Sequence, residues 1–211
     1  MNGLTLQTGL PEHLRPDAAR LYWQAFGGKL GLVMGPEPRA MQFLHRVIRT
    51  DQVIAAITSE GQLLGIAGFK TPAGSFASGQ ADDLTAIYGH FGAWWRQRVL
   101  GLLSDGVDND RFLLDGLCVE ATARSKGLGA ALLEAICSEA AIRGYHSVRL
   151  DVIDTNWRAI ALYKRLGFQV TGRQNIGLLR HFFGFSTALT MVRTLEDRPI
   201  SRMSRSPART A

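Results

Sequence analysis

The segment RSKGLG, residues 124–129, has the residue types of an anion-binding loop. It follows the apolar run FLLDGLCV and precedes the helical pattern AALLEAICSEAAIRGY. A strand that leads through glycines into a helix leaves the first backbone N–H groups of that helix without intrahelical partners, and the helix dipole favours an anion there. Because Arg124 and Lys126 add cations beside these amides, the segment predicts a phosphate-binding site.

Three phosphate-binding motifs compete for this segment. A Walker loop needs Gly-Lys-Ser or Gly-Lys-Thr at the start of the helix, but here Lys126 precedes Gly127. A Rossmann fingerprint needs a small residue three places after its second glycine, and that position holds Leu132. The pattern that remains is Arg/Gln-x-x-Gly-x-Gly/Ala, filled by Arg124, Gly127 and Gly129.

The next predicted strand and helix carry further polar candidates. SVRLDVI, residues 147–153, alternates polar and apolar residues, which predicts a strand with Asp151 on the face opposite Val152. Asn156 then caps a predicted helix, WRAIALYKRL, that ends at Gly167. This helix carries Tyr163, so a carboxylate, an amide and a phenol follow one another over two elements.

The remaining elements follow from periodicity and from turn residues. We expect strands at residues 4–10 and 111–119, helices at 16–26 and 37–49, a hairpin at 52–70, a long helix after Gly127, and final strands at 168–173 and 185–195. Glycines 27 and 28 are expected to stop the first helix. Together these elements predict one domain, residues 1–194.

An insert at about residues 80–104 is predicted to form a helix. Its apolar residues recur on one helical face: Leu84, Ile87, Tyr88, Phe91, Trp94 or Trp95, Val99 and Leu102. Glycines 89, 92 and 101 weaken this pattern.

Composition excludes several classes of protein. With 46% apolar and 20% charged residues, and no apolar run near the roughly 18 residues of a membrane helix, the 211-residue chain is typical of a soluble globular protein. Its first residues lack a basic stretch followed by an apolar one, so we expect no secretory signal and a cytoplasmic location. The two cysteines and five histidines lack metal-ligand spacing, and no structural metal is expected.

The net charge of +6 is unevenly placed, since residues 195–211 hold four arginines against two acids. This basic tail contains proline and serine and is predicted to be flexible. The positive body favours anionic ligands, phosphates included. Nucleic acid is not expected as a partner, because no basic helix face carries interleaved aromatic residues.

Two blocks, LCVEATARSKGLGAALLEA and LDVIDTNWRAIALYKRLGF, resemble the GNAT superfamily of acetyl-CoA-dependent N-acetyltransferases. The motif R-x-x-G-x-G of the first block is weak evidence alone. The motif N-x-x-A-x-x-x-Y-x-x-x-G-F of the second block follows it at the spacing found in the family, and the two together are specific. The resemblance covers residues 112–173 and is nearest to the ribosomal-protein N-terminal acetyltransferases. It implies an α+β fold: a mixed, mostly antiparallel sheet of about seven strands flanked by helices, with the helical insert before the fourth strand.

The resemblance also implies which residues bind acetyl-CoA, the acyl donor. Its pyrophosphate would lie on the backbone amides of Ser125, Lys126, Gly127, Leu128, Gly129 and Ala130, beside Arg124. Its pantetheine arm would pair with the end of the fourth strand at Leu117, Cys118 and Val119, where a backbone N–H polarises the thioester. Asn156 resembles the family's cofactor-contacting asparagine, and a helix cap explains it equally well.

Catalytic roles are implied in the same way. Tyr163 occupies the family's tyrosine position and would protonate the leaving thiolate, although a core tyrosine is the alternative. For the base that accepts the amine proton, Asp151 is preferred because it aligns with the glutamate of the ribosomal-protein enzymes. Asp115 is another candidate, because other branches place their base in this strand, two residues earlier on the same face, although Leu113 fills that aligned position here. Deprotonation by water or solvent is the further alternative, and either aspartate has another interpretation as an arginine's ion-pair partner.

The acceptor is predicted only by class. The regions that choose it in such folds are aromatic here, with Trp23, Phe26, Tyr88, Phe91, Trp94, Trp95, His181, Phe182, Phe183 and Phe185. They favour a primary amine of a small molecule or peptide with an apolar flank over polycations, unless the insert packs on the core or on a second subunit in a homodimer. Direct attack is preferred over an acyl-Cys118 intermediate. A catalytically degenerate acetyl-CoA sensor and an enzyme for longer acyl chains remain alternatives.

Overall fold

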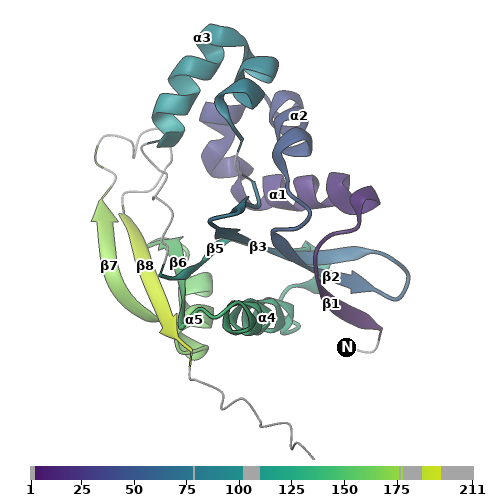
Figure 1. The fold of residues 1–211 in the computed structure, drawn as a ribbon, viewed down its shortest axis with the longest axis vertical. Helices are drawn as coiled ribbons and strands as arrows, with labels where there is room; N and C mark the ends of the chain where they lie inside the picture. Colours follow the sequence, from purple (N-terminus) through teal and green to yellow (C-terminus); the bar gives the residue numbers. More distant parts are fainter. Residues whose placement is uncertain (1–2, 78, 102–109, 176, 178–186, 196–211) are drawn as a thin grey trace, which may run out of the picture.

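A computed structural model describes residues 3–77, 79–101, 110–175, 177 and 187–195, which form an open sheet covered by helices on both faces (Figure 1). The strands are β1 (Leu4–Thr8), β2 (Val53–Thr58), β3 (Leu63–Thr71), β4 (Gly74–Ser75), β5 (Phe112–Val119), β6 (Ser147–Ile153), β7 (Gln169–Asn175) and β8 (Thr187–Thr194). The helices are α1 (Arg15–Met34), α2 (Glu37–Val47), α3 (Ala81–Gly101), α4 (Leu128–Ile142) and α5 (Trp157–Arg165). The α+β architecture predicted from the sequence is confirmed.

The sheet order is β1-β2-β3-β5-β6-β8-β7, with the short β4 paired to β3. Its strand pairs are antiparallel except β5 with β6, which run parallel. The predicted strand at residues 147–153 is observed with those bounds, and Val148, Leu150 and Val152 face the core as its alternation requires. The strand that was expected to be the fourth is β5, because the two-residue β4 precedes it.

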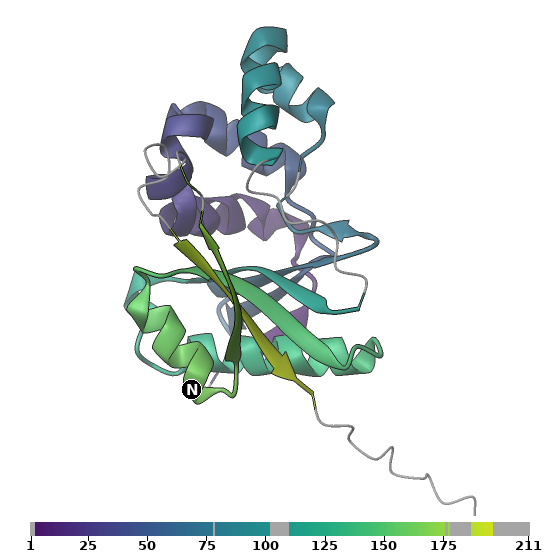
Figure 2. The ribbon, with the colours of Figure 1, turned by 90° about the vertical axis from the view of Figure 1, so that its left-hand side faces the viewer.

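The helices lie in layers on the two faces of the sheet. Helix α4 packs against the sheet through Leu128, Leu132, Leu133 and Ile136, which are buried, and α5 lies on the same side. Helices α1 and α2 cover the opposite face, and α3 stacks on them rather than on the sheet (Figures 1 and 2).

Helix α1 is longer than its sequence predicts. The expected stop at Gly27 and Gly28 is wrong, because the helix continues to Met34. Val33 and Met34 are buried against α2 and α3, and burying a large apolar side chain contributes about 1.5–3 kcal/mol, which outweighs about 1 kcal/mol for each helical glycine. Gly27 also fits its neighbour, since a Cβ there would lie 2.7 Å from the ring of Trp23.

The predicted insert helix is bent. Gly89 adopts φ 70° and ψ 170°, which breaks α3 into two segments, so one helical period does not hold across it. Leu84 and Tyr88 are buried against α2, whereas Phe91 and Trp94 of the second segment are 80% and 57% exposed. Leu102, which the sequence assigned to the same face, lies outside the described residues.

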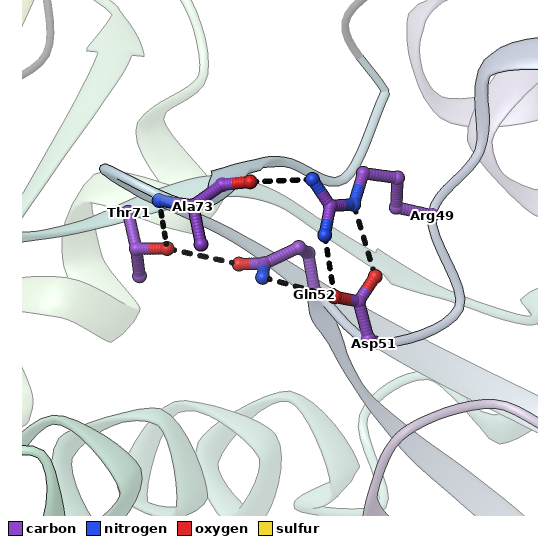
Figure 3. A network of polar contacts seen from close by, with 5 residues as sticks. All are labelled: Arg49, Asp51, Gln52, Thr71 and Ala73. Atoms are coloured by element: carbon purple, nitrogen blue, oxygen red, sulfur yellow. Dashed lines mark hydrogen bonds and ion pairs between the residues drawn. The ribbon is translucent and has the colours of Figure 1, made fainter.

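A polar network holds the hairpin formed by β3 and β4 (Figure 3). The guanidinium of Arg49 pairs with Asp51 at 2.6 Å and donates to the carbonyl of Ala73. The hydroxyl of Thr71 donates to Oε1 of the buried Gln52 at 3.3 Å and accepts from the N–H of Ala73. These bonds fix the end of β3 and so hold β4, whose Ser75 side chain reaches Asp115 of β5.

Strand β5 bulges and then separates from β6. Against β3, Gly116 pairs with Gly68 and Leu114 with Phe69, so Asp115 is an extra residue in β5. A bulge bends its strand and disrupts the ladder locally. The parallel pairing of β5 with β6 ends at Leu114 opposite Leu150, and beyond it the two strands pair only with their outer neighbours.

Candidate active site

A cavity of about 280 Å³ opens where β5 and β6 separate. Its wall includes five of the predicted catalytic and cofactor-binding residues: Asp115, Leu117, Asp151, Asn156 and Tyr163. They come from β5, β6, the cap of α5 and α5 itself. The splayed strands therefore bring together a phenol, an amide and two carboxylates that lie up to 48 positions apart in the chain.

The first turn of α4 lies beside this cavity. A Cβ on Gly129 would lie 4.0 Å from Leu117 of the cavity wall and 3.4 Å from Leu162 of α5. The helix begins after Gly127, which adopts φ 83°, and no side chain caps it. The first amides of a helix have no intrahelical acceptor, so those of Leu128, Gly129 and Ala130 are suited to an anion.

The loop before α4 exposes its cations. Arg124, Ser125 and Lys126 are exposed, and Nε of Arg124 donates to the carbonyl of Val119 at 3.1 Å. This bond joins the loop to the end of β5. The predicted phosphate-binding residues and the predicted pantetheine-binding residues are thus adjacent in space.

Tyr163 is buried and lines the cavity, and its helix α5 lies on the face of the sheet opposite α1 (Figure 1). Burial, with a smaller contribution from nearby Cys118, raises the pKa of its phenol to about 12. The group is consequently protonated at neutral pH and able to donate a proton. Its ring also contacts Phe168 at a centroid distance of 6.1 Å, so the core and catalytic interpretations are compatible.

Asp115 is held by two neutral donors. Its Oδ2 accepts from the hydroxyl of Ser75 at 2.7 Å and from the backbone N–H of Ala77 at 3.3 Å. Within the part of the chain that the structure describes, no cation pairs with this carboxylate. Ser75 belongs to β4, so the hairpin network of Figure 3 supports the position of Asp115.

Asp151 is differently engaged. One of its carboxylate oxygens lies 3.1 Å from Nη2 of Arg149, and the hydroxyl of Thr190 on β8 donates to Oδ1 at 2.6 Å. The ion pair with an arginine, which was the alternative interpretation of this residue, is therefore present. Both aspartates line the cavity, but only Asp151 has a cation against it among the described residues.

Asn156 caps α5, since its Oδ1 accepts from the N–H of Ala159 at 3.3 Å. It also lines the cavity. An asparagine side chain has an amide nitrogen besides its oxygen, so the cap leaves two N–H donors for a ligand. The two interpretations of this residue do not exclude each other.

Cys118 is almost fully buried and is not part of the cavity wall. Burial, with a smaller contribution from Asp115, raises the pKa of its thiol to about 12. A thiolate is needed for nucleophilic attack, so this environment disfavours an acyl-cysteine intermediate.

Helix α1 forms a further side of the cavity, through Tyr22, Phe26, Lys29 and Leu30, and of these the sequence singled out only Phe26. Burial, with smaller contributions from Asp115 and Cys118, raises the pKa of the Tyr22 phenol well above its usual value. Lys29 and Leu30 were placed beyond the expected end of the helix. The spacing 22, 26, 29 and 30 would have marked this face had the helix been continued.

The aromatic residues proposed to surround the acceptor are dispersed. Among the described ones, only Phe26 lines the cavity, whereas Trp23, Tyr88, Phe91, Trp94 and Trp95 are not part of its wall. Tyr88 donates to the carbonyl of Met34, and Arg96 stacks on Tyr88 at 4.0 Å and on Trp95 at 4.3 Å. The hydrogen bond of Tyr88 attaches α3 to α1, and the two stacking contacts of Arg96 lie within α3. His181, Phe182, Phe183 and Phe185 lie outside the described residues.

This fold and site define an acyltransferase. The chain belongs to the acetyltransferase (GNAT) family, whose model matches residues 16–168. That range includes β5, the loop before α4 and Tyr163. No curated protein matches the chain.

Solved structures share the fold. An N-acetyltransferase from Staphylococcus aureus Mu50 is similar with a TM-score of 0.62 and 15% identity, covering 89% of this chain and 99% of that one. A crystal structure described as an acetyltransferase is similar with a TM-score of 0.60 and 18% identity, covering 91% of this chain and 100% of that one. The ribosomal-protein-S18-alanine N-acetyltransferase from Escherichia coli is similar with a TM-score of 0.54 and 18% identity, covering 94% of this chain and 97% of that one. At these identities the likeness shows the fold alone.

Two further findings concern the described residues. None of their helices is both long and apolar enough to cross a bilayer. Nor do they contain a group of three or more His, Cys, Asp or Glu side chains placed to hold a metal ion.

Proposed function

We propose that the protein transfers the acetyl group of acetyl-CoA to a primary amine by direct attack in a ternary complex. The observation that carries this proposal is the cavity between the separated β5 and β6, which has Tyr163 and Asp115 in its wall and the uncapped start of α4 beside it. The residues fit acetyl-CoA, because the anionic end of the molecule needs amides and cations and its thioester end needs an apolar cleft with a proton donor.

Each part of acetyl-CoA has residues suited to it. The amides from Ser125 to Ala130 would hold the pyrophosphate, with Arg124 and Lys126 as exposed cations beside it. Beyond Leu114, the edge of β5 that faces β6 has no ladder partner among the described residues, so Leu117 to Val119 are available to pair with the pantetheine arm. The amide of Asn156 would contact the same arm.

In the transfer step the amine nitrogen attacks the thioester carbonyl carbon, a C–N bond forms and the C–S bond breaks. Tyr163, protonated in its buried site, donates a proton to the leaving sulfur. We assign the amine proton to Asp115 rather than Asp151, because Asp151 already has Arg149 against it and Asp115 accepts only from neutral groups. No cation of the described residues pairs with Asp115, so the carboxylate is available to a protonated amine of the acceptor.

Release of the CoA thiol, measured with acetyl-CoA and a panel of small amines, amino acids and peptides, tests this function. Turnover of a primary amine, with the N-acetyl product seen by mass spectrometry, is expected. Calorimetric binding of acetyl-CoA without turnover of any amine would instead indicate a sensor. A faster reaction with propionyl-CoA or longer thioesters would indicate a different acyl donor.

A further inference from the structure

Lys29 is a cation on the cavity wall that has no ion-pair partner among the residues that the structure describes. The other two basic residues of α1 are both engaged, Arg15 with Glu12 and Arg20 with Glu120. Lys29 has no such ion pair or hydrogen bond within residues 3–77, 79–101, 110–175, 177 and 187–195. Charged side chains are seldom buried without a partner, so a half-buried lysine in a cavity is suited to a ligand.

The position of Lys29 on α1 separates it from the carboxylate of Asp115. Tyr22 is near Asp115, while Lys29 is seven residues further along the same helix face, about 10 Å along the axis. Burial alone lowers the pKa of the Lys29 amine, and no carboxylate contributes to that shift. The cavity therefore has a negative group and a positive group on its wall that are not paired with each other.

Between these charges the wall is apolar. Phe26 and Leu30 of α1 and Leu114 of β5 line it. The volume, about 280 Å³, is slightly below the roughly 300–1,000 Å³ typical of small-molecule sites, which favours a compact acceptor.

We infer that Lys29 binds an anionic group of the acceptor, so that the acceptor is a small amine carrying a carboxylate or similar anion and an apolar portion. This inference rests on the proposed function and adds the acceptor class to it. In this arrangement the amine lies toward Asp115, the anion pairs with Lys29, and the apolar portion contacts Phe26 and Leu30. An acceptor that lacks the anion leaves Lys29 without a partner, which weakens its binding.

Matched acceptors test the inference in the full-length protein. Leucine, leucinamide and the phosphonate analogue of leucine differ only in the anionic group, and 6-aminohexanoate and its amide place that group further from the amine. We expect kcat/KM to be at least about 10-fold higher for the anionic member of a pair, since charge-assisted bonds are the strong ones. The phosphonate distinguishes a general anion site from one shaped for a carboxylate.

Two variants separate the charge of Lys29 from its volume. Lys29→Met should raise KM for the anionic acceptors roughly 10- to 100-fold, with little change in kcat or in the turnover of the neutral amides. Lys29→Arg should restore most of the affinity. Equal turnover of anionic and neutral acceptors, or a preference that survives in Lys29→Met, would overturn the inference while leaving acetyl transfer intact.

A binding measurement separates this inference from the proposed function. If no amine turns over, calorimetric binding of leucine to the CoA-loaded protein, lost in Lys29→Met, would still support the anion site. Absence of both binding and turnover would overturn it. Intact-mass spectrometry after incubation with acetyl-CoA alone completes the test, because acetylation of Lys29 itself would show that this amine is an acceptor rather than an anion-binding group.

Discussion

Oγ of Ser75 lies 2.7 Å from Oδ2 of Asp115 and donates a hydrogen bond to it. Ser75 belongs to β4 and Asp115 to β5, where Asp115 is the extra residue of the bulge. The carboxylate is thus oriented by neutral donors, whereas Asp151 is neutralised by Arg149. The two candidate bases differ in their partners more than in their position.

Replacing each aspartate by asparagine compares the two bases directly. We expect Asp115→Asn to lower kcat/KM by roughly 10²–10⁴, the usual contribution of a general base, with acetyl-CoA affinity unchanged. Asp151→Asn should cost less than about 10-fold, because its carboxylate is already paired. Thiol release and calorimetry measure both effects. A larger loss in Asp151→Asn would assign the base to β6.

Tyr163→Phe tests the proton donor. Since the change removes only the hydroxyl, kcat should fall by roughly 10²-fold or more while acetyl-CoA affinity and thermal stability stay close to those of the unmodified protein. Because the pKa of this phenol is about 12, ionisation of Tyr163 should cause no loss of activity as pH rises from 7 to 10. Unchanged kcat in Tyr163→Phe would limit the tyrosine to a core role.

Cys118→Ala should retain acetyl transfer, and iodoacetamide should label neither Cys118 nor Cys137 in the folded protein at pH 8. The pKa values of these buried thiols are raised to about 12 and about 11, so thiolate is scarce. A thiol that stays protonated when folded but ionises when unfolded destabilises the fold as pH rises above its unfolded pKa. The free energy of unfolding should therefore fall between pH 9 and 10, and less so in Cys118→Ala.

Gly127→Glu and Gly144→Glu form a matched pair at the two ends of α4. Their φ angles are 83° and 82°, and neither has an atom within 4 Å of an added Cβ. Both changes should destabilise the protein similarly, by about 1–2 kcal/mol. Only Gly127→Glu should abolish acetyl-CoA binding, because it places a negative charge at the anion site. Equal affinity in the two variants would argue against phosphate binding at this turn.

Gly27→Ala and Gly28→Ala test the continuation of α1. Gly28 has open space around it, so alanine should stabilise the helix by about 0.5–1 kcal/mol. At Gly27 the added methyl would lie 2.7 Å from the Trp23 ring and should cost about 1–3 kcal/mol. Denaturant unfolding measures both. We expect the two substitutions to change the free energy of unfolding in opposite directions. A helix that ended at Gly27 would instead give two small and similar changes.

Local signals predicted much of the fold. The hairpin around residues 59–61, the strand at 147–153 and the cap at Asn156 are observed where the sequence placed them, because each depends on residues within a few positions. The errors at Gly27 and Gly89 are opposite in kind. In α1, burial of Val33 and Met34 overrides a local stop, and in α3 the positive φ of Gly89 redirects a helix that its periodicity would have continued.

By itself the sequence determined the pattern from Arg124 to Gly129, which is a matter of spacing along the chain, and through the resemblance to a family it nominated Tyr163 and the pair of candidate aspartates. Only the tertiary structure decided that Ser75 holds Asp115, that Arg149 occupies Asp151 and that Lys29 lines the same cavity. Ser75 and Asp115 are 40 residues apart, and the cavity adds Lys29 of α1 to residues of β5, β6 and α5. Such packing depends on the sum of many distant contacts, which no short stretch of sequence contains.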